Sequence, residues 1–289
     1  MEQERLTHTA LGRLLRERGK VASFGDVVLT FASLGSTNDT ALDYVRRGLP
    51  HGSVVMADEQ TAGRGRRGRA WISPPGVGLY LTALLRGTEA SSPAAHLLPL
   101  AASVAAAEAL RDPAAGEAVP VVIRWPNDLY VGERKLAGIL CEATFSGARL
   151  EHAVVGVGIN VNHEIRHFGE ELAERATSLR LVTGRPQERV ELAARLVERL
   201  EHWWDRSLAS DTSGVLARWR ELAEGAQGMK VLVERSGAPV EASGVSGAHA
   251  FEATTAGLAE DGGLRVRLQD GRLLTLYSAE VVSLRPMGA

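Results

Sequence analysis

The sequence predicts an α+β fold, in which a mixed, largely antiparallel sheet is flanked by helices and followed by a small β-barrel. The first observation is a run of four strand-like segments between residues 119 and 161. Their connecting turns are too short for a helix, and such turns join antiparallel neighbours. The second is that helical patterns stand before and after this meander. The third is a β-rich tail, broken by Gly, Ser and Asp-Gly, that is typical of a small barrel.

The elements of the first part follow from local patterns. Residues 6–18 predict a short amphipathic helix and residues 25–34 a strand. Ser36 with an acid three residues later is a capping-box pattern, so a second helix begins there and stops at 48–50. A compact apolar run then predicts a buried strand over 53–57.

The second part predicts more helices before the β-rich tail. An Ala-rich pattern indicates a helix over 92–110, and periodic patterns indicate helices over 188–209 and 213–224. Since the pattern changes after residue 226, we expect two domains, at 1–226 and 227–289.

Composition excludes several classes of protein. Apolar residues make up 45% of the chain and charged residues 24%, as in an ordinary globular protein rather than a disordered one. The net charge of −2 gives no molecule-wide signature of nucleic-acid binding. The polar start and the lack of an apolar run of about 18 residues predict a cytoplasmic protein. Cys141 is the only cysteine, which excludes an internal disulfide, and its apolar neighbours predict a buried, inert thiol.

The strongest chemical signal is the stretch Gly-Arg-Gly-Arg-Arg-Gly-Arg at 63–69, named here the arginine loop. Guanidinium groups bind phosphate or carboxylate, and glycines let the backbone approach an anion closely. A solvated basic loop, or an RNA-binding module, is the alternative. RNA-binding segments of this composition usually lie in long disordered tails, whereas this one lies between a buried strand and Trp71. Its position therefore favours a ligand clamp that closes over its ligand.

A second candidate is Lys135, one of only three lysines among 33 basic residues. If residues 132–133 form a turn, Lys135 lies opposite 128–130 on the adjacent strand. A compact ammonium can reach one oxygen of a reacting phosphate. The alternative is a structural ion pair with Asp128, and the two roles can coexist.

Three further patterns are weaker. The segment GVGIN at 156–160 lacks the third glycine and the helix of a dinucleotide motif. Residues 163–167 match the HExxH zinc pattern, but such matches arise by chance and need an ordered helix and a third ligand. A zinc hydrolase is therefore a disfavoured alternative. The spacing of Trp203, Trp204 and Trp219 is typical of a helical core.

Taken together, these motifs resemble those of bacterial biotin protein ligases, the biotin–[acetyl-CoA-carboxylase] ligases. The resemblance covers roughly residues 30 to 285 and implies a class II synthetase-like catalytic domain with an SH3-like C-terminal barrel. Only 35 residues precede Ser36, too few for the DNA-binding domain of about 60 residues that some members carry, so we expect a ligase without repressor activity. The matching segments, in the order of the family, are STN at 36–38, QTAGRGRRGRAW at 60–71, RWPND at 124–128, KLAGIL at 135–140, GVGIN at 156–160 and ATSL at 176–179.

The resemblance implies a two-step reaction. The carboxylate of biotin attacks the α-phosphate of ATP, which yields biotinyl-5′-AMP and pyrophosphate. A lysine of a biotin carrier protein, expected to be an acetyl-CoA carboxylase subunit, then displaces AMP. Mg²⁺ is expected with ATP, and Asp128 could help to hold it. Neither DNA nor a membrane is expected as a partner, and the resemblance leaves monomer and homodimer open.

The resemblance also implies the roles of individual residues. Neutral polar groups suit the ureido ring, and cations suit the carboxylate and the phosphate. No residue is assigned as a metal ligand. The implied catalytic residues are Lys135 and Arg66, the biotin-binding residues Ser36, Thr37, Asn38, Gln60, Arg64, Gly65, Arg66 and Lys135, and the ATP-binding residues Arg69, Trp71, Asn127 and Asn160.

The chain departs from the family at three places. Arg124 stands where many members have Lys, and Ala176 stands where some have an aromatic residue that stacks on adenine. An insertion around 243–255 lengthens the C-terminal barrel. The closest rival function is a ligase that attaches lipoate or octanoate through the same kind of fold. A flexible acyl chain needs fewer polar partners than residues 36–38 and Gln60 supply, and this favours biotin.

Overall fold

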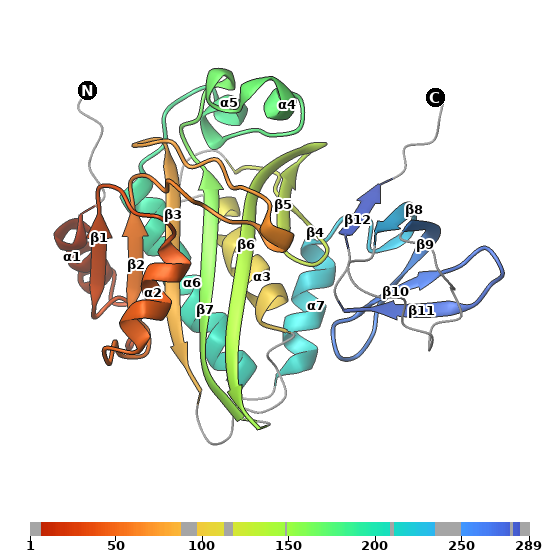
Figure 1. The fold of residues 1–289 in the computed structure, drawn as a ribbon, viewed down its shortest axis with the longest axis horizontal. Helices are drawn as coiled ribbons and strands as arrows, with labels where there is room; N and C mark the ends of the chain where they lie inside the picture. Colours follow the sequence, from red (N-terminus) through yellow and green to blue (C-terminus); the bar gives the residue numbers. More distant parts are fainter. Residues whose placement is uncertain are drawn as a thin grey trace.

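A seven-stranded sheet forms the centre of the larger part of the chain (Figure 1). The computed structural model describes residues 7–87, 97–112, 118–147, 149–208, 211–234, 250–277 and 280–283. Only the β1–β2 pair of this sheet is parallel, so the predicted mixed, largely antiparallel sheet is confirmed. In spatial order the strands are β1 (Val28–Phe31), β2 (Val54–Ala57), β3 (Gly78–Arg86), β7 (Arg149–Asn160), β6 (Arg134–Ser146), β5 (Asp128–Val131) and β4 (Val122–Arg124).

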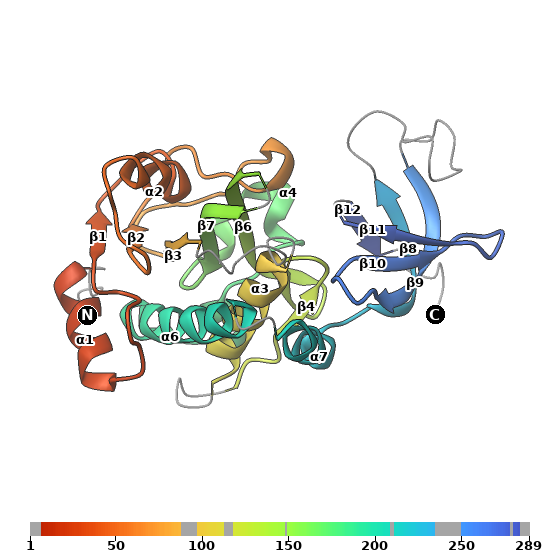
Figure 2. The ribbon, with the colours of Figure 1, turned by 90° about the horizontal axis from the view of Figure 1, so that it is seen from below.

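Helices cover the two faces of this sheet unequally (Figure 2). Helices α3 (Leu98–Arg111) and α6 (Arg189–Leu208) lie on one face, and α2 (Thr37–Val45) lies on the other. None of the helices in the described residues is long and apolar enough to cross a bilayer. The remaining helices are α1 (His8–Arg18), α4 (Gly169–Ala173), α5 (Leu179–Thr183) and α7 (Thr212–Leu222).

The alternation of side chains along the central strands gives the sheet two different faces. Leu81, Ile139 and Val157 point into the main core with α3 and α6, where each buried side chain stabilises the fold by about 1.5–3 kcal/mol. The residues on the opposite face of β3, β6 and β7 include Thr82 and Gly156. Because this face carries glycine and polar residues and α2 covers only part of it, space remains for a site.

Two strands were not predicted from the sequence. The stretch GLYLTALLR of β3 is almost continuously apolar, and all but its last residue are buried. Such a run lacks the two-residue alternation that identifies a strand. Strand β9 (Ala250–Leu258) overlaps the end of the expected insertion, and the rest of that insertion lies outside the described residues. The predicted start of the Ala-rich helix at residue 92 also lies outside them.

The C-terminal part forms a second sheet that begins at Gln227. In the described residues β11 and β12 are its edges, so the pairing that would close the predicted barrel is not seen there. The division into domains at 226 and 227 remains a prediction. The strands, in spatial order, are β11 (Leu273–Leu276), β10 (Leu264–Arg267), β9, β8 (Gln227–Glu234) and β12 (Glu280–Ser283).

Candidate active site

A cavity of about 750 Å³ lies between the open face of the large sheet, the arginine loop and the C-terminal sheet. This volume is within the range of sites that bind drug-sized ligands. Val231 and Leu264 of the C-terminal sheet form part of its wall. The cavity brings together all twelve residues that the sequence singled out: Ser36, Thr37, Asn38, Gln60, Arg64, Gly65, Arg66, Arg69, Trp71, Asn127, Lys135 and Asn160.

Neutral groups that bind one another lie at one end of the cavity, here named the polar cluster: Thr37, Asn38 and Gln60, with Thr82 behind them. The backbone N–H and the hydroxyl of Thr37 both donate to Oε1 of Gln60, at 2.9 and 3.1 Å. The Nε2 of Gln60 donates to the hydroxyl of Ser73 at 3.0 Å. These contacts fix the orientation of the Gln60 amide, since a backbone N–H requires the oxygen as its acceptor.

The Asn38 side chain is fixed from three sides. Its Nδ2 donates to the carbonyl of Leu140 at 3.1 Å and to Glu142 at 2.8 Å. Its Oδ1 accepts from the hydroxyl of Thr82 at 2.7 Å. A Cβ atom on Gly156 would lie 2.2 Å from this Oδ1, so only glycine leaves room for the amide. Asn38 is buried, and its rotamer is therefore determined by the fold.

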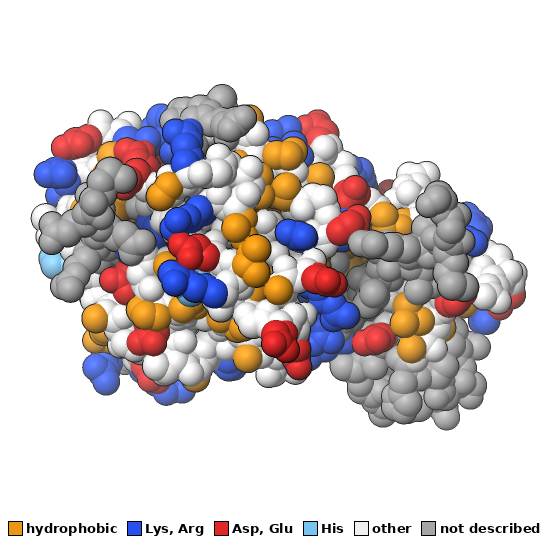
Figure 3. All heavy atoms as spheres, turned by 90° about the horizontal axis from the view of Figure 1, so that it is seen from above, with side chains coloured by type: hydrophobic (Ala, Val, Ile, Leu, Met, Phe, Trp, Pro, Cys, Tyr) orange, Lys and Arg blue, Asp and Glu red, His pale blue; other side chains and the backbone are white. Residues whose placement is uncertain are grey.

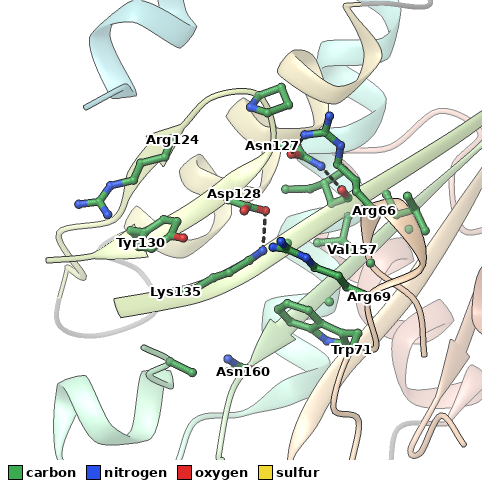
Figure 4. Close-up of a pocket in the computed structure, with 18 of the residues that line it drawn as sticks. Arg66, Arg69, Trp71, Arg124, Asn127, Asp128, Tyr130, Lys135, Val157 and Asn160 are labelled. Carbon is green, nitrogen blue, oxygen red and sulfur yellow. Dashed lines mark hydrogen bonds and ion pairs between the residues drawn. The ribbon is translucent and has the colours of Figure 1, made fainter. Parts of the chain in front are cut away.

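Cationic groups gather at another part of the cavity. The Nζ of Lys135 lies 2.7 Å from Oδ1 of Asp128 (Figure 4), and Lys135 pairs with Tyr130 across the β5–β6 turn. The predicted hairpin is thus confirmed, and the ion pair that was the alternative role of Lys135 is present. The backbone of Lys135 also bonds Arg175 and Thr177, at 2.8 and 2.9 Å. The lysine is held by its main chain as well as by its ammonium group.

Arg66 and Arg69 of the arginine loop point toward this cationic region (Figure 4). An Nη atom of Arg66 donates to Oδ1 of buried Asn127 at 3.3 Å, and the Nδ2 of Asn127 donates to the carbonyl of Ile139. The Nδ2 of Asn160 donates to the carbonyl of Thr177 at 3.0 Å. Both asparagines therefore have side-chain orientations set by backbone groups.

Trp71 lies over a pair of glycines in the sheet. Gly138 and Gly158 are cross-strand partners on β6 and β7. A Cβ on Gly158 would lie 2.5 Å from Nε1 of the indole, and one on Gly138 would lie 3.3 Å from the ring. The Nζ of Lys135 is 5.4 Å from the ring centroid, within cation–π range. Because neither glycine has a side chain, the indole packs directly against the backbone of β6 and β7.

Arg64 and Arg67 of the loop also bind protein groups. Arg64 forms ion pairs with Asp39 and Glu142, the second at 3.5 Å. Arg67 donates to the backbone carbonyl of Glu234 on β8 at 3.0 Å. Since Arg64 is engaged by two carboxylates, the anion-binding role expected for its side chain stays a prediction.

Sequence reasoning missed several residues of the site. Thr82 and Glu142 hold Asn38, and Ser73 holds Gln60. Thr82 gave a weak signal, because it interrupts an otherwise apolar run. The contribution of strands β8, β9 and β10 to the cavity wall gave no signal in the sequence, since it depends on how the second sheet packs on the first.

Arg124, which also lines the cavity, binds groups of the protein itself. It forms ion pairs with Glu133 and Glu224, both at 3.0 Å, and its guanidinium lies 4.3 Å from the centroid of the Tyr130 ring. Burial opposes the charge, yet the hydrogen bonds that the guanidinium donates to the two glutamates outweigh it and raise the pKa of Arg124.

The HExxH match lies in a packed region near the cavity. The ring of His163 stacks on Phe168 with centroids 5.3 Å apart, and burial lowers the pKa of His163 to about 3. The Nδ1 of His167 accepts the N–H of Glu164 at 2.8 Å. No group of three or more potential metal ligands exists among the described residues. These contacts are those of packed, hydrogen-bonded histidines.

Cys141 lies on β6, and one face of the molecule carries both acidic and basic side chains (Figure 3). Cys141 is only partly buried rather than buried as expected, yet desolvation still raises the pKa of its thiol to about 12, as expected for an inert thiol. On the described part of the face shown in Figure 3, basic and acidic side chains are interspersed with hydrophobic ones. This mixture differs from the clustered basic surface typical of RNA-binding proteins.

The chain has relatives among known proteins. Residues 30–160 match the model of the biotin/lipoate A/B protein ligase family. The chain is 29% identical over 248 residues to the bifunctional ligase/repressor BirA of Bacillus spizizenii, covering 86% of this chain and 71% of that protein. It is 34% identical over 171 residues to the biotin–[acetyl-CoA-carboxylase] ligase of Mycobacterium tuberculosis, covering 59% and 61%.

The fold is also similar to that of solved structures. One is the biotin protein ligase of Aquifex aeolicus in complex with biotin and ATP, with a TM-score of 0.72 and 27% sequence identity. The similarity covers 90% of this chain and 100% of that one. Since the larger part ends at residue 226 of 289, the similarity extends into the C-terminal part.

Proposed function

We propose that this protein is an ATP-dependent biotin–protein ligase, on the premise that its residues 30–160 match the model of the biotin/lipoate A/B protein ligase family. It activates biotin as biotinyl-5′-AMP and transfers the biotinyl group to a lysine of a carrier protein. The observation that carries the proposal is that one cavity combines a cluster of oriented neutral polar side chains with cationic side chains.

The polar cluster suits the neutral ureido ring of biotin. That ring has two N–H donors and one carbonyl acceptor, and Thr37, Asn38 and Gln60 supply uncharged acceptors and donors. These side chains are already oriented by bonds within the protein. Binding of biotin therefore needs little reorganisation of these side chains. An acid without a ureido ring would leave buried polar groups of the cluster without a partner, and this cost would disfavour its binding.

The cationic side chains suit the adenylation step. A carboxylate oxygen of biotin forms a bond to the α-phosphorus of ATP, and the bond from phosphorus to the pyrophosphate oxygen breaks. Lys135 and Arg66 stabilise the negative charge that develops on the phosphate oxygens. In the second step the neutral amine of the carrier lysine attacks the biotinyl carbonyl, AMP leaves, and the nitrogen loses a proton.

Mg²⁺ and the carrier protein complete the proposal. Asp128, Glu133 and Glu224 line the cavity, but each is paired with Lys135 or Arg124. Mg²⁺ is commonly held by substrate phosphates and one or two carboxylates, so an ion that arrives with ATP and shares Asp128 fits these residues. The carrier is expected to be the biotin carrier subunit of acetyl-CoA carboxylase. A cytoplasmic location and the absence of DNA binding remain predictions.

An acid-activation assay tests the proposal. The purified protein is incubated with ATP, Mg²⁺ and either biotin or lipoate, and acyl-AMP and pyrophosphate are measured by mass spectrometry. We expect biotinyl-AMP, and a loss of about 10²–10³ in its rate of formation for Lys135→Ala, the range found when one preorganised donor is removed. Lys230→Ala, at an exposed lysine of β8, is the matched control and is expected to behave as the wild type.

The outcomes separate the candidate functions. Adenylate formed with lipoate and not with biotin would show that the protein is a ligase that attaches lipoate. Zinc-dependent hydrolysis lost on chelation would support the HExxH alternative, and salt-sensitive RNA binding without adenylate would support the RNA-binding one. No adenylate with either acid would contradict the proposed ligase activity.

A further inference from the structure

The geometry around the polar cluster points to a residue that no sequence motif marks. We propose that Thr82 is a positioning residue that determines ligand specificity, because its single hydroxyl proton decides which of the acceptors on Thr37 and Asn38 stays available to a ligand. This inference rests on the proposed function and deepens it. Thr82 lies on β3 and is fully buried, with no exposed surface.

The hydroxyl of Thr82 stands between two acceptors. Its Oγ1 lies 2.8 Å from Oγ1 of Thr37 and 2.7 Å from Oδ1 of Asn38. A threonine hydroxyl has one proton, so it can donate to only one of them at a time. The other acceptor then keeps a lone pair for an N–H group of a ligand. Thr37 and Asn38 line the cavity and Thr82 does not, so Thr82 would influence a ligand only through these two residues.

The two ends of this chain of bonds are fixed by other groups. The carbonyl of Leu140 and the carboxylate of Glu142 both accept from Nδ2 of Asn38, which forces its Oδ1 toward Thr82. Gln60 accepts the Thr37 backbone N–H, which fixes Thr37. With both ends set, the middle hydroxyl decides which acceptors the cluster presents to the cavity.

The packing supports the same assignment. Thr82 is the cross-strand partner of Gly156, and a Cβ on Gly156 would collide with Oδ1 of Asn38. On β3 the hydroxyl of Thr82 can donate to the Asn38 amide, and on β7 the absence of a side chain at Gly156 leaves room for it. The two residues together hold this amide between the strands.

Valine has nearly the shape of threonine but no hydroxyl, so Thr82→Val tests the role of the hydroxyl proton with little change in packing. Binding of biotin alone, without ATP, is measured by calorimetry, and KM values for biotin and ATP are measured in the adenylation assay. We expect Thr82→Val to weaken biotin binding about tenfold, equivalent to about 1.4 kcal/mol. The KM for biotin rises in parallel and the KM for ATP stays within about twofold. Thr82→Ser, which keeps a hydroxyl, restores most of the affinity.

The matched control is Ser103→Ala. Ser103 is also fully buried and donates its hydroxyl to a carbonyl, that of Leu100 at 2.7 Å, but it lies in α3 outside the cavity. We expect this variant to lose stability in thermal unfolding without a change in biotin affinity. Should Thr82→Val not fold, the comparison of Thr82→Ser with Thr82→Ala serves the same purpose.

Three results would overturn the assignment. The first is wild-type biotin affinity in Thr82→Val, and the second is an equal rise in the KM values for biotin and ATP. The third is a failure of Thr82→Ser to recover. A wild-type protein that does not bind biotin at all would overturn the proposed function instead, so the two failures are distinguishable.

Discussion

At the scale of single residues, buried polar side chains in this protein keep one orientation because neighbouring groups leave them no other. Asn38, Asn127 and Asn160 each donate an amide proton to a backbone carbonyl. An amide fixed in this way presents a known donor or acceptor to a ligand. Preorganisation of this kind lowers the entropy that binding must overcome.

His163 predicts a dependence of stability on pH. Burial lowers its pKa to about 3 in the folded state, against about 6.5 in the unfolded chain. Between these values the unfolded state binds more protons, so the free energy of unfolding falls as the pH falls from 6.5 toward 3. The contribution of His163 to this slope is at most about 1.4 kcal/mol per pH unit.

Urea unfolding of the wild type and of His163→Gln, followed from neutral pH down to about pH 4, measures this contribution. We expect the variant to be less stable at neutral pH and to have a shallower slope. Burial also lowers the pKa of His51, so part of the slope remains in the variant. A slope identical to that of the wild type would contradict the buried neutral state of His163.

At the scale of elements, one carboxylate joins the segment after α1 to α6. Buried Glu201 on α6 accepts the backbone N–H groups of Ala22, Ser23 and Phe24, at 2.8, 2.7 and 3.1 Å. It also accepts the Ser23 hydroxyl at 3.0 Å. Three backbone donors would otherwise be left without a partner when this turn packs on the helix.

Glu201→Ala is therefore expected to lower the free energy of unfolding by about 3 kcal/mol, the upper range for buried groups left unsatisfied. Chemical denaturation measures this change. The matched control is Glu17→Ala, which removes a carboxylate from an exposed pair with Arg13, 3.7 Å away on α1, and is expected to change stability by less than about 1 kcal/mol. Equal effects of the two substitutions would show that Glu201 is not an anchor.

At the scale of the whole molecule, the cavity depends on the packing of the two sheets. Nε1 of Trp125 donates to the carbonyl of Gly262 at 3.3 Å, and Arg67 bonds the backbone of β8. Gly262 lies against α3, where a Cβ would be 2.8 Å from side-chain atoms of both Leu97 and Leu100. The C-terminal sheet therefore completes a wall of the cavity only while this contact is intact.

Gly262→Ala tests this dependence. The substitution adds a methyl group at the contact, and we expect a lower melting temperature and faster proteolysis of the C-terminal sheet, with at least a several-fold loss of adenylation. The control is Gly271→Ala, because Gly271 has nearly the same positive φ, 87° against 89°, but a Cβ added there would meet no atom within 4 Å. Backbone strain is thus equal in the two variants. The same loss in both would contradict the role of the contact.

Local sequence patterns determined most of the elements. Helices α1, α2, α6 and α7 and the meander from β4 to β7 agree with the prediction, because caps, periodicity and short turns act over a few residues. The motifs also identified residues that meet in one cavity. The charge and hydrogen-bonding groups of Lys135 and of the arginine loop follow from their amino-acid types, which the sequence gives directly. The sequence alone thus determined most of the elements, the likeness to a family and the twelve residues assigned to the candidate site, but not those that hold them in place.

The tertiary structure decided what depends on contacts between distant segments. Strand β3 has no alternation to reveal it, since both of its faces are buried and it lies between β2 and β7. Only pairing in the sheet shows that Thr82 meets Asn38, 44 residues away along the chain. The same holds for the C-terminal wall of the cavity and for the ion pairs of Arg64. The physical reason is that hydrogen-bond partners and packing neighbours are set by the approach of chain segments, which no local pattern encodes.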